Sequence, residues 1–200
     1  MDSRAVAELI VHLGRIGSGE GGVAGLSPVQ WAALRYFARA NRFSRTPSGF
    51  AAFHGTTRGT ASQTIKGLVA AGYLTQHRSQ ADGRSVRLSL TDKARAILAD
   101  DPIKGLAAAA DGLPPGMRDR FSDSLLRVLG QLAEDTGQPL FGTCRSCAHF
   151  GGEGCCLAGD PVYACRFANE TLSEAELDEF CINFVSEAPR SSERPQGGRV

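Results

Sequence analysis

The hydrophobic pattern between residues 27 and 98 changes from a helical period to an alternating one, and this change restricts the chain to few folds. Apolar residues recur at helical spacing from about 28 to 40 and again from 58 to 71. Ser27 precedes the first segment and Thr57 the second, and both residue types cap helices. These signals predict two amphipathic helices.

A shorter helical segment at 47–54 lies between these two, so that the segment at 58–71 is the third helix in chain order, and a basic hairpin follows it. Residues 73–78 and 84–90 alternate between apolar and polar side chains, as strands with one buried face do, and the turn-forming residues 80–83 separate them. Thr91 then caps a further helix. The order helix, helix, helix, hairpin predicts a winged helix-turn-helix.

Amphipathic segments flank this region on both sides. Helical spacing is present over 3–16, 103–110 and 117–136. The predicted fold class is therefore mainly α with a small β-hairpin wing (α+β), in which flanking helices surround the winged region.

The formal charge changes sign along the chain. Residues 1–100 contain 13 Lys and Arg against 6 Asp and Glu, whereas residues 141–200 contain 5 against 9. A basic first half suits a polyanionic partner such as DNA, and an acidic tail does not. We therefore expect the two ends to have different roles.

Three stretches carry a family likeness. They read SPVQWAALRYFARA, PSGFAAFHGTTRGTASQTIKGLVAAGYL and TQHRSQADGRSVRLSLTDKARAIL, and together they span about Ser27 to Leu98. They include Asp82-x-Arg84 in the predicted wing and Gly72 after the third helix. This combination resembles the MarR family of transcription regulators. The resemblance implies a homodimer that binds a double-stranded DNA operator with two-fold symmetry.

The third helix is the expected recognition helix. With Ala61, Ile65 and Leu68 buried, its opposite face carries hydroxyls, an amide and cations, which are the groups that read base edges in a major groove. Arginines of the hairpin can reach the phosphate backbone or an adjacent minor groove. The predicted DNA contacts are Thr57, Arg58, Thr60, Ser62, Gln63, Lys66, Arg78, Arg84 and Arg87.

All six cysteines lie between Cys144 and Cys181. We expect a cytoplasmic protein, because the N-terminus carries acids where a secretory signal would be basic and then apolar. In that compartment a tight cysteine cluster indicates a metal or redox site rather than a disulfide framework. The spacing Cys144-x2-Cys147 presents two thiolates to one ion or cluster, in zinc and iron–sulfur sites alike.

Apolar residues next to the thiols make this segment similar to small iron–sulfur modules of the high-potential type. The resemblance implies a [4Fe–4S] cluster held by Cys144, Cys147, Cys155 and Cys181, with Cys156 and Cys165 as spare thiols. The sequence leaves three alternatives open: zinc in place of the cluster, free or reversibly paired thiols, and Cys156 or Cys165 as a ligand instead of Cys155.

These inferences divide the chain into five parts. The expected parts are a dimerisation helix with a Gly-rich connector at 1–26, the winged helix DNA-binding domain at 27–98, further dimerisation helices at 99–140, a small Cys-rich metal module at 141–187, and a disordered tail at 188–200.

No catalytic arrangement is present in the sequence, because the four histidines are scattered and no nucleophile accompanies a base. We therefore predict no enzyme activity. The predicted function is that of a DNA-binding repressor whose cluster senses redox state, oxygen or iron. One alternative is an iron–sulfur or zinc protein whose winged domain mediates protein interaction or electron transfer. Another is a regulator with a structural zinc that senses a small lipophilic ligand, bound by Trp31, Phe37 and Phe53.

Overall fold

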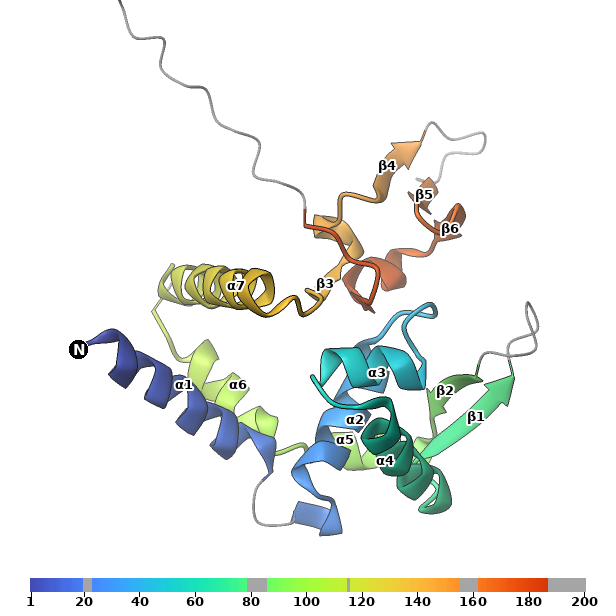
Figure 1. The fold of residues 1–200 in the computed structure, drawn as a ribbon, viewed down its shortest axis with the longest axis horizontal. Coiled ribbons are helices and arrows are strands. Elements are labelled where there is room, and N and C mark those ends of the chain that lie inside the picture. Colours follow the sequence, from blue (N-terminus) through green and yellow to red (C-terminus); the bar gives the residue numbers. More distant parts are fainter. Residues whose placement is uncertain (20–22, 79–85, 115, 155–161, 187–200) are drawn as a thin grey trace, which may run out of the picture. The chain divides into compact units, whose positions relative to one another are not determined.

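The computed structural model describes residues 1–19, 23–78, 86–114, 116–154 and 162–186. The chain divides into two compact units, Met1–Pro139 and Leu140–Val200. Each unit is described by itself below, and Figure 1 labels their elements.

The first unit is helical with one hairpin. Its elements are α1 (Ser3–Ser18), a short 3-10 turn (Val23–Gly25), α2 (Pro28–Arg39), α3 (Pro47–Phe53), α4 (Arg58–Ala70), β1 (Leu74–Arg78), β2 (Val86–Leu90), α5 (Asp92–Leu98), α6 (Ile103–Asp111) and α7 (Met117–Thr136). This order confirms the predicted winged helix-turn-helix with helices on both sides.

Side-chain caps fix where the central helices begin. The Ser27 hydroxyl accepts a hydrogen bond from the Gln30 amide, while the Gln30 side chain accepts one from the Ser27 amide, so α2 starts with a complete capping box. The hydroxyls of Thr57 and Thr91 accept from the amides three residues later, both at 3.2 Å. The structure thus confirms all three predicted caps, because capping depends on residues adjacent in sequence.

The core of the first unit lies among α2, α3, α4 and the hairpin. Its largest fully buried side chains are Trp31, Leu34, Tyr36, Phe37, Phe50, Ile65, Leu68, Leu74 and Leu88. Tyr36 packs against the rings of Phe37 and Phe50, with centroids 5.2 and 5.8 Å away. Trp31 and Phe37 are therefore core residues, whereas Phe53 is partly exposed.

The hairpin is antiparallel, and its register places Leu74 opposite Leu90 and Arg78 opposite Val86. The alternating pattern of 84–90 predicts one buried face, which would carry Val86, Leu88 and Leu90. Only Leu88 is buried, and the other two are half-buried, because a two-stranded wing at the edge of the unit is covered over one part of its face. The turn between the strands lies outside the described residues.

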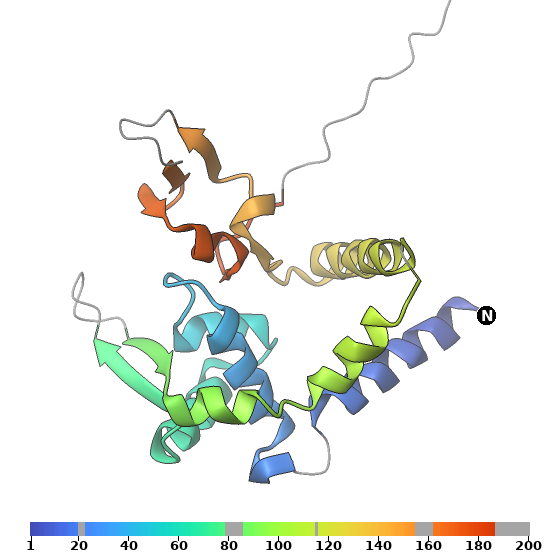
Figure 2. The ribbon, with the colours of Figure 1, turned by 180° about the vertical axis from the view of Figure 1, so that it is seen from behind.

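The flanking helices leave apolar side chains uncovered within a single chain. Helices α1 and α6 run side by side, as Figures 1 and 2 show from opposite sides. In α7 no residue is buried, although Phe121, Leu126 and Leu129 are apolar and 42, 61 and 55% exposed. These helices have a hydrophobic stripe without a partner in the described part of one chain.

The second unit is built from short strands and turns. It contains β3 (Gly142–Thr143), a 3-10 turn η2 (Cys144–Ser146), β4 (Phe150–Gly154), β5 (Val162–Cys165), β6 (Glu170–Leu172), a 3-10 turn η3 (Glu174–Asp178) and β7 (Phe180–Cys181). Strand β3 pairs with β7, and β4, β5 and β6 form a second antiparallel sheet. Ser173 is the cap residue of η3, and Glu176 completes a capping box with it.

Among the described helices, none combines the length and apolar composition that a membrane span requires.

Candidate nucleic-acid interface and cysteine cluster

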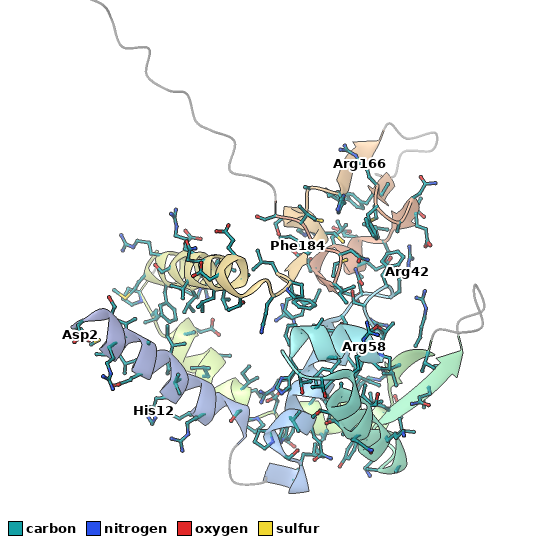
Figure 3. The ribbon with its side chains drawn as sticks, in the orientation of Figure 1. Asp2, His12, Arg42, Arg58, Arg166 and Phe184 are labelled. Carbon is teal, nitrogen blue, oxygen red and sulfur yellow. The ribbon has the colours of Figure 1, made fainter. Side chains whose placement is uncertain are left out.

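The recognition helix α4 presents its predicted polar face to solvent. Ala61, Ile65 and Leu68 are buried against the unit, as expected from their spacing. Arg58, Thr60, Gln63 and Lys66 are exposed on the other side, Thr57 is exposed at the cap, and Ser62 is half-buried. Figure 3 shows Arg58 at the start of this helix. The helix contains two cations and no acid, so its exposed face is positively charged.

The hydroxyls at the start of α4 hold one another in place. Thr57 and Thr60 are 2.9 Å apart between their hydroxyl oxygens, in addition to the capping bond from the Thr60 amide. The other backbone amides of the first turn point out of the end of the helix, where a phosphate oxygen can accept hydrogen bonds from them. This end of α4 can therefore bind an anion and place Arg58 beside it.

The wing residues divide into three cases. Arg78 ends β1, but its side chain lies outside the described part, and the whole of Arg84 lies outside the described residues. Arg87 is half-buried on β2, and its guanidinium donates a hydrogen bond to the carbonyl oxygen of Arg42. The Arg87 side chain thus secures the loop before α3, while a role in DNA binding stays a prediction.

A second hydrogen bond joins the hairpin to the loop between α2 and α3, and the sequence did not predict it. The Leu88 amide donates to the Arg45 carbonyl oxygen at 2.9 Å, and the Arg45 guanidinium donates to the Ala40 carbonyl oxygen at 2.7 Å. The loop between α2 and α3 is therefore bound to the wing. No local pattern indicates the contact between Leu88 and Arg45, because these two residues lie far apart in sequence.

The backbone of the second unit brings together cysteines from both ends of the segment. The Cys147 amide donates to the Cys144 carbonyl oxygen at 3.1 Å, so the Cys144-x2-Cys147 motif forms a turn. Pairing of β3 with β7 sets Gly142 opposite Cys181. Cys165 ends β5 opposite Phe150. Cys155 and Cys156 lie outside the described residues.

The thiols of this cluster are buried and influence one another. Cys144, Cys147 and Cys181 are buried, Cys165 is half-buried, and all four are free rather than joined in disulfides. Burial, followed by the neighbouring thiols of Cys181, Cys165 and Cys147, raises the pKa of Cys144 to about 12. In the described part, no three His, Cys, Asp or Glu side chains are close enough together to hold a metal ion.

An exposed ion pair joins the cysteine turn to η3. The Arg145 guanidinium donates to both carboxylate oxygens of Asp178, at 2.8 and 3.2 Å. The hydrogen bond from Arg145 holds the pKa of the Asp178 carboxyl below its usual value. Because both side chains are in solvent, this pair aligns the two turns more than it stabilises them.

Comparison with known proteins shows which fold the first unit resembles. The family model described as "MarR family" matches residues 24–85. A search of the curated proteins found no match. The solved structure of a MarR transcriptional regulator from Methanosarcina mazei Go1 is similar with a TM-score of 0.52 and 21% identity, covering 66% of this chain and 99% of that one.

Two structures of DNA complexes are also similar. The S. aureus MepR–DNA complex has a TM-score of 0.54 and 13% identity, covering 66% of this chain and 96% of that chain. Streptococcus pneumoniae FabT in complex with DNA has a TM-score of 0.50 and 22% identity, covering 66% and 93%. The prediction that this chain is not an enzyme agrees with the matched family of transcription regulators. The first unit of the chain has the winged-helix fold of the MarR transcription regulators.

Proposed function

We propose that this protein is a homodimeric, sequence-specific DNA-binding transcription regulator that acts as a repressor. The observation that carries the proposal is the exposed polar and cationic face of α4, whose opposite face is buried in the core. Such a helix can enter a major groove without losing its packing. The similarity of the fold to structures determined with DNA supports the same interpretation.

Substitutions on α4 test the DNA contact. Arg58→Ala and Gln63→Ala are each expected to weaken binding to an operator selected from a random duplex library by about 5- to 150-fold, since a base contact contributes about 1–3 kcal/mol. Fluorescence anisotropy with labelled duplex measures the effect, and thermal unfolding checks that the fold is retained.

The matched control is Arg4→Ala, which removes the same charge from an exposed ion pair with Glu8 on α1. It should leave operator affinity unchanged. The logarithm of wild-type affinity should also fall linearly with the logarithm of salt concentration. A flat salt response would instead favour a winged unit that binds protein.

The uncovered apolar stripes of α1, α6 and α7 support a homodimer. Exposed apolar residues on α1 include Val6, Leu9 and Ile16, in addition to those on α7. A second copy of the chain would bury these stripes and place two recognition helices on one operator.

Leu129→Glu is expected to dissociate this dimer. The substitution removes an apolar side chain that contributes about 1.5–3 kcal/mol on burial and puts a charge in its place. The dimer dissociation constant should rise by about 100-fold or more. Light scattering after size-exclusion chromatography measures the mass, and Gln131→Glu, which adds a charge to an exposed position two residues away, is the control. A monomeric wild type would contradict the homodimer.

The second unit is the proposed sensor. We propose that it binds a [4Fe–4S] cluster through Cys144, Cys147, Cys155 and Cys181 and responds to redox state, oxygen or iron. The buried, disulfide-free thiols support this assignment, because iron–sulfur clusters are held by thiolates shielded from water. Zinc is the alternative occupant of the same thiols.

Cys181→Ser is expected to abolish the visible absorption of anaerobically purified protein and to change operator affinity by about 5- to 150-fold, the usual size of such coupling. Cys155→Ser should have the same effect and Cys165→Ser neither. If Cys165→Ser loses the visible absorption and Cys155→Ser keeps it, Cys165 is the fourth ligand in place of Cys155. Unchanged affinity in Cys181→Ser protein without a cluster would exclude sensing while leaving DNA binding in place.

A further inference from the structure

The chain passes twice between the winged core, defined here as α2 to α5 with the hairpin, and the helices that carry the apolar stripes. The first passage lies between α1 and α2, and the second between α5 and α6. Helices α1 and α6 lie side by side (Figures 1 and 2), and a methyl group on Gly17 would come within 4.0 Å of the Ile103 side chain. Both passages therefore leave the stripe helices at one place.

One side chain of the winged core contacts both passages. Arg35, on α2, donates from Nε to the two carboxylate oxygens of Asp101 at 3.0 and 2.8 Å, and from Nη2 to the Gly17 carbonyl oxygen at 2.9 Å. Asp101 also accepts from the Ile103 amide at 2.8 Å, which ties its carboxylate to the start of α6. Because a guanidinium is planar and its donors diverge at fixed angles, these contacts leave little freedom of rotation.

The surroundings of this pair keep most solvent away from it. The Asp101 side chain is 7% exposed and that of Arg35 is 20% exposed. Trp31, fully buried on the same helix, lies close to Gly19 in the first passage, where an added methyl group would be 3.0 Å from the indole ring and 3.2 Å from Pro102. A poorly hydrated ion pair is little screened, so it holds its geometry better than a surface pair does.

The angle between the stripe helices and the winged core decides where a dimer places its two recognition helices. In the proposed dimer the stripes contact the second copy, while α4 belongs to the winged core. Two recognition helices must lie about 34–36 Å apart to enter successive major grooves. One base pair added between the half-sites moves the second by about 3.4 Å along the DNA and turns it by about 35°. A rigidly held core cannot follow this change, whereas a loosely held core can.

We propose that Arg35 and Asp101 are positioning residues that set which half-site spacing the dimer accepts, because they fix the angle between the stripe helices and the winged core. The inference rests on the homodimer of the proposed function and deepens it. The pair contacts no base and acts through the placement of α4. Its removal should therefore relax the discrimination between operators of different spacing.

Operators of altered spacing test the inference. The full chain is titrated against three labelled duplexes with the same half-sites: the operator selected from the random library, and two versions with one base pair added or removed at the centre. Fluorescence anisotropy gives a dissociation constant for each. We expect wild-type protein to bind both altered duplexes about 30-fold or more weakly. Losing one of two half-sites removes half of the free energy behind a specificity of about 10³-fold or more.

Arg35→Lys is expected to reduce this spacing penalty by about 5-fold or more, the lower end of the usual coupling between two parts of a protein. Lysine keeps the charge but replaces the planar fork with one rotatable ammonium group. A second variant, Arg35→Leu with Asp101→Leu, removes the pair without leaving a buried charge unpaired, so it serves if Arg35→Lys folds poorly. Partial unfolding lowers the active concentration for all three duplexes alike and cancels from the ratio of dissociation constants.

Arg95→Lys is the matched control. It makes the same exchange in an exposed ion pair with Asp92, and both residues lie on α5 within the winged core. Its spacing penalty should equal that of wild-type protein.

Three outcomes would overturn the inference. A wild-type penalty in both Arg35 variants overturns it alone and leaves the proposed function in place. A variant that light scattering shows to be monomeric assigns the pair to the dimer interface instead. Wild-type protein that binds a single half-site as tightly as the whole operator overturns the homodimer of the proposed function, and this inference with it.

Discussion

Gly49→Ala is expected to destabilise the first unit by about 1–5 kcal/mol, although alanine is the better helix former. Gly49 is buried in α3, and a methyl group on it would overlap the carbonyl oxygen of Ser44 and the hydroxyl oxygen of Tyr36. Those two atoms form a buried hydrogen bond of 2.7 Å. Overpacking costs about 1–3 kcal/mol and the disrupted buried bond about 1–3 kcal/mol, against a gain in helix propensity of about 1 kcal/mol.

The effect can be measured by urea unfolding, followed by the fluorescence of Trp31, the one tryptophan and a fully buried residue. The same substitution at Gly105 on α6 is the control, because nothing lies within 4 Å of the place that the added methyl group would take. Gly105→Ala should raise stability by up to about 1 kcal/mol. Equal changes at the two sites would contradict the close approach at Gly49. Because α3 packs against α4, operator affinity should fall with the stability of this region.

Asp101→Ala is expected to cost about 3–5 kcal/mol, because it leaves a charge without its partner in a poorly solvated position. The Arg35 guanidinium, on α2, donates to both carboxylate oxygens of Asp101, with Nε at 3.0 and 2.8 Å. It also donates to the Gly17 carbonyl oxygen at 2.9 Å, and Asp101 accepts from the Ile103 amide at 2.8 Å. The side chain of Asp101 is 7% exposed.

This network joins three elements that the proposed function needs together, since α1 and α6 carry the apolar stripes and α2 belongs to the winged unit. Asp100→Ala, at the exposed neighbouring acid, is the control and should change stability by less than about 0.5 kcal/mol. Replacing both Arg35 and Asp101 with leucine should cost less than Asp101→Ala alone, since no unpaired charge remains. If Asp101→Ala costs less than about 1 kcal/mol, water replaces the carboxylate and the network is not structural.

Caps and periodicity act over a few residues, and these parts of the fold could be predicted. Ser27, Thr57 and Thr91 begin their helices as expected, and Gly72, the glycine that follows the third helix in the sequence, adopts the left-handed conformation common at helix ends. The spacing of Ala61, Ile65 and Leu68 predicted the buried face of α4. The opposite face of the helix was thereby predicted to be exposed. Residues close in sequence are sufficient to predict these features, because the hydrogen bonds of a cap and the spacing of a helix face involve only such residues.

The role of Arg87 shows where such signals end. In sequence it is one more cation on a basic hairpin, and the wing pattern assigns it to DNA. In the structure its guanidinium reaches a carbonyl oxygen in the loop before α3, 45 residues away in sequence. An arginine can donate hydrogen bonds to a phosphate oxygen or to a carbonyl oxygen. Only the packing of the loop beside the hairpin shows that the Arg42 carbonyl oxygen is within reach, and the contact of Arg87 with DNA stays a prediction.

Local sequence patterns were enough to predict the order of elements in the first unit and the polar face of α4, and the positions of the cysteines confine the thiols to the second unit. Each of these depends on residue type and short-range spacing. Folding alone places Gly49 against the Tyr36 hydroxyl, pairs Asp101 with Arg35, and buries Cys144, Cys147 and Cys181. These contacts join residues distant in sequence, and their energies arise from desolvation and close packing, which exist only after the chain has folded.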